Sequence, residues 1–104
     1  LRVRVFSFDV RQQGLLPPPP GGRFSIYLGT GGPGHLDPRL NDGVAEYSQG
    51  VKEDPSWEAR TFELFDAILA DASACLVAVC HSFGLLCRWS GIAQPVERAA
   101  ITSL

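Results

Sequence analysis

The chain has 104 residues, of which 45% are hydrophobic and 19% charged, and its formal net charge is −2. This length suits one small domain with a modest core. The nine lysine and arginine residues are scattered, which argues against nucleic acid or an anionic membrane as a partner. No segment is long and apolar enough to cross a bilayer. The three cysteines include no Cys-x-x-Cys pair, so the composition predicts a soluble, cytoplasmic protein with free thiols and no thiolate metal site.

The N-terminal part of the chain predicts two strands joined by a stiff connector. Residues 2–10 alternate between polar and apolar side chains, which is typical of a strand. Residues 14–22 contain four consecutive prolines, which remove backbone donors and favour an extended segment. A proline-rich ligand for an SH3 or WW domain is the less favoured interpretation of this tract. Residues 24–28 predict the second strand.

Glycines crowd the turn at residues 29–34, which directly follows the second strand. Backbone N–H groups in such a turn can face an anion. The spacing fits neither a phosphate-binding Walker loop nor a dinucleotide-binding turn, and an ordinary loop is the simpler interpretation. Residues 35–53 are polar and predict a long surface loop, with a short helical turn near residues 44–47. Loops of this length in small domains are often functional.

A helix is predicted over residues 55–71. Asp54 precedes it as an N-cap, and Pro55 occupies its first position. An apolar stripe at helical spacing predicts the face toward the core; it comprises Trp57, Thr61, Leu64, Phe65 and Ile68, with Phe62 and Leu69 beside it. The charged side chains take the other side and predict a solvated face; they are Glu58, Arg60, Glu63, Asp66 and Asp71.

The most informative segment joins a short apolar strand at residues 75–79 to a C-terminal helix. Phe83, Leu86 and Trp89 are spaced by three and predict this helix, and Gly91 stands where the helix would stop. Cys80 lies at the junction, where free N–H groups and the positive end of the helix dipole favour a thiolate nucleophile. This is the cysteine version of the strand–turn–helix elbow of the α/β-hydrolases. The alternative is that Cys80 is a small buried hydrophobic residue.

The order strand, strand, helix, strand, helix predicts an α/β fold, because a helix that connects two strands of one sheet makes them parallel. In open parallel sheets, ligands bind beyond the carboxyl ends of the strands. The glycine turn at residues 29–34 and Cys80 both lie at such ends. We therefore expect the two to meet at one edge of the sheet.

In this order the chain resembles a class I glutamine amidotransferase domain of the type found in GMP synthase and anthranilate synthase. Residues 1–34 resemble the family's second strand, a proline-bearing connector and a third strand that ends in Gly-Gly-Pro-Gly. Residues 54–71 resemble the helix that follows, and residues 75–91 resemble the strand, nucleophilic cysteine and helix. The resemblance implies a flavodoxin-like parallel sheet with helices on both faces. Residues 1–104 would then be a partial domain without its first strand–helix unit and its C-terminal catalytic part.

The resemblance also implies roles for individual residues. Cys80 would attack the side-chain amide of glutamine and form a thioester. The oxyanion hole would use the backbone N–H groups of Gly31, Gly32 and His81, while Gly34 and Ser82 would lie near the substrate. No cofactor is implied, and the partner would be a synthase domain or subunit that accepts ammonia. The fragment alone is expected to be inactive, because the family's catalytic His and Glu come further downstream.

The elbow departs from the family's usual Gly-x-Cys-x-Gly-x-Gln, because Ala78 and Ser82 occupy the two glycine positions and Gly84 occupies the glutamine position. The missing glutamine removes a side chain that helps hold the substrate. The segment Ala-Val-Cys-His is similar to the Ala-Ile-Cys-His elbow of the related DJ-1/PfpI group. A cysteine hydrolase or redox-responsive protein of that group is therefore one alternative, and a catalytically inactive relative that binds a partner or metabolite is another.

Local residues that could replace the downstream base have ordinary structural interpretations. His35 could approach Cys80, and His81 is its neighbour in sequence, but consecutive side chains at a helix start diverge by about 100°. Both histidines are expected to be surface or hydrogen-bonded structural residues. Three acidic side chains could contact a polar substrate but are expected to be solvated; they are Glu46, Glu53 and Asp54.

Overall fold

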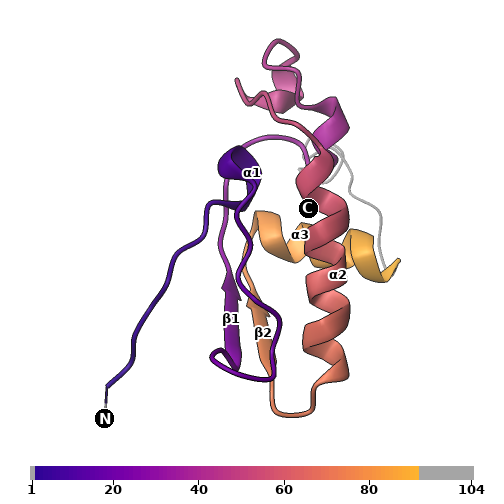
Figure 1. The fold of residues 1–104 in the computed structure, drawn as a ribbon. Coiled ribbons are helices and arrows are strands. Elements are labelled where there is room, and N and C mark those ends of the chain that lie inside the picture. The colour runs from indigo at the N-terminus through magenta and orange to yellow at the C-terminus, as the bar shows by residue number, and fades with distance from the viewer. Residues whose placement is uncertain (1, 92–104) are drawn as a thin grey trace, which may run out of the picture.

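The computed structural model describes residues 2–91, which form a small α/β fold (Figure 1). Its elements in chain order are α1 (Val10–Gln13), β1 (Ile26–Gly29), the 3₁₀ turns η1 (Pro38–Leu40) and η2 (Glu46–Ser48), α2 (Ser56–Ala70), β2 (Cys75–Ala78) and α3 (His81–Ser90). The two strands pair in parallel, with Ile26 opposite Cys75 and Gly29 opposite Ala78. The parallel pairing confirms the crossover that the order of elements predicts.

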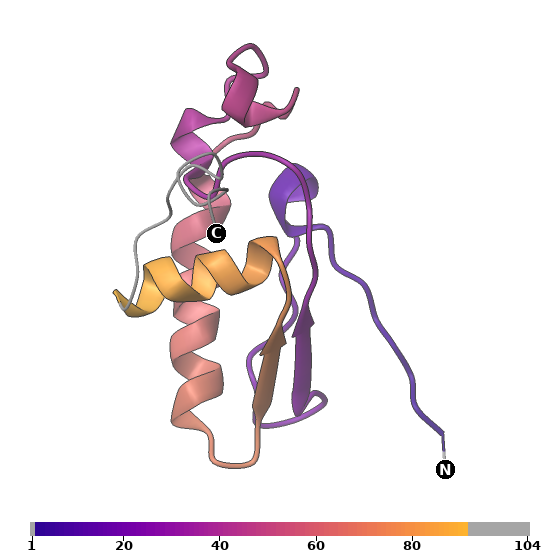
Figure 2. The same cartoon turned by 180° about the vertical axis from the view of Figure 1, so that it is seen from behind.

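The core lies between the sheet and the two long helices, and α3 runs across α2 in both views (Figures 1 and 2). Its buried apolar side chains come from β1, α2 and α3; they are Tyr27, Trp57, Phe65, Ile68 and Leu85. The Tyr27 hydroxyl donates to the carbonyl oxygen of Pro18 at 2.7 Å, which ties the proline connector to β1. The core is therefore built on one face of the sheet.

The opposite face of the sheet is largely open in the described residues. Ile26 and Leu28 of β1, Val77 of β2 and the following Val79 are all exposed. Parallel sheets are normally covered on both faces, because helices connect their strands on either side. The described part of the chain thus shows the helical layer on one face only, and not the expected helices on both.

The strand predicted over residues 2–10 is absent. Residues 2–9 run away from the sheet (Figure 1), and Val3 and Val5 are 80% and 84% exposed. Asp9 then caps α1, because its side chain accepts the N–H of Gln12 at 3.1 Å. An alternating pattern marks which side chains would share a face, but a strand also needs a neighbouring edge to satisfy its backbone groups.

Helix α2 matches the predicted apolar stripe but corrects the predicted solvated face. Trp57, Thr61 and Ile68 are buried, whereas Leu69 is exposed. Glu58 is also buried, with its side chain only 7% exposed, and it forms ion pairs with the exposed Arg39 and the half-buried Arg88. The helix begins one residue later than predicted, at Ser56, whose N–H donates to Asp54 Oδ1 at 2.8 Å.

Leu86 and Trp89 of helix α3 pack against the core as partly buried residues, but the centre of the buried face differs from the spacing pattern. His81 and Leu85, four residues apart, are buried, whereas Phe83 is exposed. Residues two positions apart on a helix lie on nearly opposite sides, so packing through Leu85 turns Phe83 outward. The helix ends at Gly91, whose left-handed conformation (φ 73°) is the helix stop predicted from the sequence.

The structure also shows the state of the cysteines and the length and hydropathy of the helices. All three cysteines are free, with Cys75 and Cys80 exposed and Cys87 half-buried. Within residues 2–91, no helix has the length and hydropathy that a membrane span requires.

Candidate functional site

Cys80 forms a strained elbow between β2 and α3. Its φ of 53° and ψ of −117° lie in a region that non-glycine residues rarely adopt. The N–H of Ser82 donates back to the carbonyl oxygen of Val79 at 3.1 Å, which closes the turn, and the thiol-bearing residue stays exposed. Backbone strain of this kind costs about 1–3 kcal/mol and is concentrated at functional sites. A sharp strand-to-helix turn with an exposed side chain at its tip is the geometry of a nucleophile elbow.

The glycine loop, residues 29–34, lies directly against this elbow. A Cβ atom on Gly31 would stand 3.1 Å from Cys80 Cβ and 3.7 Å from its Sγ, and one on Gly29 would stand 2.6 Å from Ser82 Cβ. The Ser82 hydroxyl donates to the carbonyl oxygen of Thr30 at 2.5 Å, which joins the elbow to the loop. The two features that the sequence places at the carboxyl ends of the strands therefore meet.

Three backbone donors beside the thiol have no acceptor within residues 2–91. They are the N–H groups of Gly31, Gly32 and His81. Gly34, in contrast, donates its N–H to Gln49 Oε1 at 2.9 Å, and the Ser82 hydroxyl is engaged with Thr30. The three proposed oxyanion donors are thus available to a ligand, whereas the two residues expected near the substrate brace the loop.

Neither histidine acts on the thiol in this structure, and no side chain in residues 2–91 forms a hydrogen bond with Cys80. Nδ1 of His35 accepts the N–H of Asp37 at 2.9 Å, so this nitrogen is engaged away from the thiol. His81 is buried, and its Nε2 lies 3.4 Å from the carbonyl oxygen of His35. Burial, reinforced by the charge of Arg11, lowers the pKa of His81 below its usual 6.5, so this ring is neutral.

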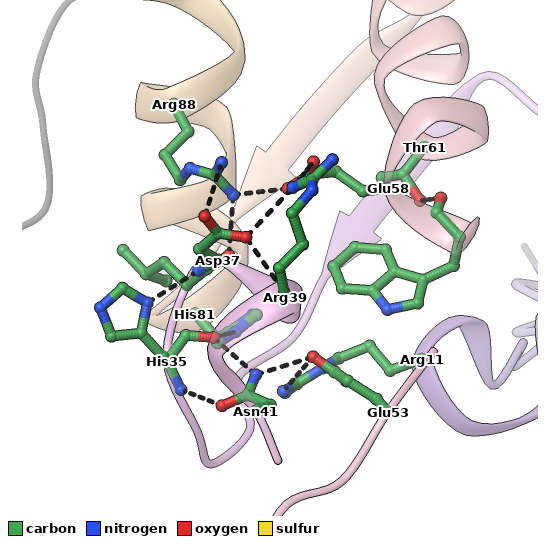
Figure 3. Close-up of polar contacts among 12 residues, drawn as sticks. Arg11, His35, Asp37, Arg39, Asn41, Glu53, Glu58, Thr61, His81 and Arg88 are labelled. Carbon is green, nitrogen blue, oxygen red and sulfur yellow. Dashed lines mark hydrogen bonds and ion pairs between the residues drawn. The ribbon is translucent and has the colours of Figure 1, made fainter. Parts of the chain in front are cut away.

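An ionic cluster around the buried Glu58 holds the segment after the glycine loop (Figure 3). Glu58 of α2 pairs with Arg39 at 2.8 Å and with Arg88 of α3 at 2.5 Å. Arg88 also donates to the carbonyl oxygen of Leu36 at 3.0 Å. Burial alone would raise the pKa of Asp37, but hydrogen bonds from Arg39 and the nearby charge of Arg88 lower it below its usual value. These contacts tie residues 36–39 to both long helices.

A second network backs the glycine loop itself, also shown in Figure 3. Arg11 of α1 forms a two-pronged ion pair with Glu53, with Nε to Oε2 at 2.8 Å and Nη2 to Oε1 at 3.1 Å. Asn41 donates to Glu53 Oε1 at 2.8 Å and to the carbonyl oxygen of His35 at 2.9 Å, and it accepts the N–H of His35 at 2.8 Å. The Glu53 side chain is fully buried, which corrects its predicted place as a solvated loop charge.

Sequence reasoning missed Arg11, Asn41 and Glu58 as residues of this region. Arg11 and Glu53 are 42 residues apart, and Glu58 and Arg88 are 30 apart. Periodicity within one helix or strand carries no information on such pairings. The sequence offers one indication of the second network. The loop over residues 35–53 is long, and its polar residues Asn41 and Glu53 can supply the side-chain hydrogen bonds that hold such a loop. Among the described residues, no three His, Cys, Asp or Glu side chains gather closely enough to hold a metal ion.

Comparisons with known proteins assign neither a family nor a function to the chain. No protein-family model matches the chain, and searches of curated proteins and of solved structures find no match either.

Proposed function

We propose that the chain carries the nucleophile and the oxyanion hole of a thiol hydrolase similar to class I glutamine amidotransferases. The observation that carries this proposal is the elbow at Cys80, an exposed cysteine with φ of 53° at a strand–helix junction. Gly31 lies against it, and three backbone donors nearby are free. A flavodoxin-like sheet is part of the same proposal, and the open apolar face of the sheet supports it, because such sheets carry helices on both faces.

In the proposed reaction, the Cys80 thiolate attacks the carbonyl carbon of a side-chain amide, and the carbonyl oxygen becomes an oxyanion. The N–H groups of Gly31, Gly32 and His81 donate to that oxygen, and one such donor contributes about 3–4 kcal/mol. The C–N bond then breaks, the nitrogen leaves as ammonia after accepting a proton, and a thioester remains. Water hydrolyses the thioester to a carboxylate and restores the thiol. No side chain in residues 2–91 forms a hydrogen bond with Cys80, so we assign these proton transfers to the downstream His and Glu that the resemblance implies.

The alternative is a cysteine hydrolase or redox-responsive protein similar to the DJ-1/PfpI group. The exposure of Cys80, together with its lack of a hydrogen-bonded base in residues 2–91, favours it. A redox-responsive thiol reacts with peroxide, and its oxidation stops at a stable sulfinic acid. Formation of that species at Cys80 under mild peroxide would support the alternative over amide chemistry.

The test is made on the full-length protein and uses a glutamine analogue that carries a diazoketone, which alkylates a thiol only where a glutamine site positions it. Cys75 is an internal control, because it is also exposed but lies at the opposite end of β2. Tandem mass spectrometry locates the label. We expect Cys80 to be labelled at neutral pH and Cys75 to stay unlabelled. Equal labelling of the two cysteines, or none at Cys80, contradicts the proposal and leaves a relative that binds without catalysis.

A further inference from the structure

Three arginines share one surface cavity, which we call the arginine cavity. It is open to solvent, has a volume of about 450 Å³, and is lined by Arg2, Arg4, Phe6, Arg23 and Phe24. None of the three arginines forms a hydrogen bond or an ion pair within residues 2–91, and no carboxylate lines the cavity. Positive charge therefore collects here without a counter-charge from the described part of the protein.

The other four arginines of residues 2–91 all bind protein groups. Three form ion pairs with buried glutamates and the fourth donates to a backbone carbonyl oxygen; they are Arg11, Arg39, Arg88 and Arg60. The basic residues are scattered along the sequence, and the formal net charge of the chain is −2. The fold thus gathers the unpaired arginines of the described residues in one place, against the overall sign of the charge.

The alternating sequence of residues 2–9 builds one side of the arginine cavity. Arg2, Arg4 and Phe6 are two residues apart and belong to an extended segment (Figure 1). In an extended chain, such residues project to the same side at intervals of about 7 Å. All three line the cavity. The alternation that forms no strand ladder therefore places two guanidinium groups along one cavity.

Aromatic contacts fasten this segment to β1 and hold the third arginine. The Arg23 guanidinium lies 4.6 Å from the centre of the Phe6 ring, which is a cation–π contact. Phe6 meets Phe24 edge to face, with the ring centres 5.4 Å apart. Phe24 in turn meets the buried Tyr27 of β1 at 6.3 Å. The rings thus connect the arginine cavity to the core, although its arginines are exposed.

We propose that Arg2, Arg4 and Arg23 bind a small molecule that carries a diphosphate group. A guanidinium group donates two parallel hydrogen bonds to the oxygens of one phosphate. A single phosphate group carries about two negative charges at neutral pH, so three arginines match two linked phosphates better than one. A carboxylate has one charge and two oxygens, and it would leave most of these donors unused.

The size and surroundings of the arginine cavity favour a small molecule over a nucleic acid. Its volume lies in the range of small-molecule pockets. A nucleic acid strand needs further basic groups along its path, and the other arginines of the described residues are engaged by the protein. No residue of the Cys80 elbow lines the cavity, so this site does not depend on the function proposed for the thiol.

Isothermal titration calorimetry on the full-length protein tests the site with inorganic diphosphate, ADP, inorganic monophosphate and AMP. We expect each diphosphate to bind at least about tenfold more tightly than its monophosphate, because the second phosphate adds charged hydrogen bonds. Equal affinity for inorganic diphosphate and ADP supports the free anion as the ligand, whereas tighter binding of ADP supports a nucleoside diphosphate. Equal affinity for monophosphates and diphosphates, or no binding of either diphosphate, contradicts the proposal.

Variants at Arg4 locate the binding. Arg4→Gln removes one of the three charges and is expected to weaken diphosphate binding by about tenfold or more. Arg4→Lys keeps the charge but replaces the planar fork by a single ammonium, and it should weaken binding by less. The matched control, Lys52→Gln, removes the same charge from an exposed side chain that does not line the cavity, and it should leave the affinity unchanged. Far-UV circular dichroism checks that each variant is folded, as expected for changes at exposed residues.

Three results with these variants would overturn the proposal. If Arg4→Gln binds diphosphate as tightly as wild type, the ligand is bound elsewhere. If Arg4→Gln and Lys52→Gln weaken binding equally, the attraction acts at long range and the arginines form no site. If a single-stranded oligonucleotide binds more tightly than ADP and loses that binding in Arg4→Gln, the arginines serve a nucleic acid and not a small molecule.

Discussion

Residues 2–9 carry the alternating pattern of a strand and lie exposed, whereas residues 29–40 carry no periodic pattern and are held firmly. The first segment forms no ladder with β1. In the second, side chains from distant segments satisfy the backbone: Gln49 and Asn41 accept N–H groups, and Arg88 donates to a carbonyl oxygen. The difference shows that order in this small fold follows from partners for backbone polar groups more than from periodicity.

The largest expected effect comes from removing the anion that ties residues 36–39 to the helices. Glu58→Ala leaves the half-buried Arg88 with only Asp37, 3.8 Å away, as a carboxylate partner, and we expect a cost of about 3 kcal/mol, the lower end for breaking a buried ion pair. We expect that loss in the free energy of unfolding, measured by urea denaturation. Glu63→Ala makes the same change on the exposed side of α2 and should alter stability by no more than about 0.5 kcal/mol. Equal losses in the two variants would show that the cluster does not hold the loop.

Much of the fold, and part of the site, could be predicted from local sequence. The buried stripe of α2, the strand before Cys80 and the stop at Gly91 follow from spacing and from residue type, which act within a few residues. The meeting of the glycine loop with Cys80 followed from topology. The burial of Glu58 and Glu53 could not be predicted, since a charge is buried only when a partner is brought to it by the whole fold.

Phe83 illustrates the same limit within one helix. Its spacing with Leu86 and Trp89 suits a buried face, yet Leu85 is the fully buried residue. Several faces of α3 carry apolar residues, so the pattern leaves its rotation open. The crossing with α2 decides it, because Leu85 packs in one cluster with Trp57 and Phe65.

A smaller effect is expected where the glycine loop meets the elbow. A Cβ atom from Gly29→Ala would stand 2.6 Å from Ser82 Cβ, so the elbow must shift, and overpacking of this kind costs about 1–3 kcal/mol. Gly22→Ala is the matched control in the connector. Its Cβ would meet no atom within 4 Å, and it should be neutral or stabilise by about 0.4–1 kcal/mol through the unfolded chain. Urea denaturation that places both variants on the same side of wild type would contradict the close approach.

The smallest effect is expected in residues 2–9. Val5→Thr replaces a methyl group by a hydroxyl on a side chain that is 84% exposed, and it should change the free energy of unfolding by no more than about 0.5 kcal/mol. Val10→Thr makes the same replacement five residues later, where the side chain packs against the core, and it should cost about 1 kcal/mol or more. Urea denaturation of both variants measures the difference. A Val5→Thr loss as large as that of Val10→Thr would mean that residues 2–9 pack as a strand after all, and the contrast between the two segments would then rest on the glycine loop alone.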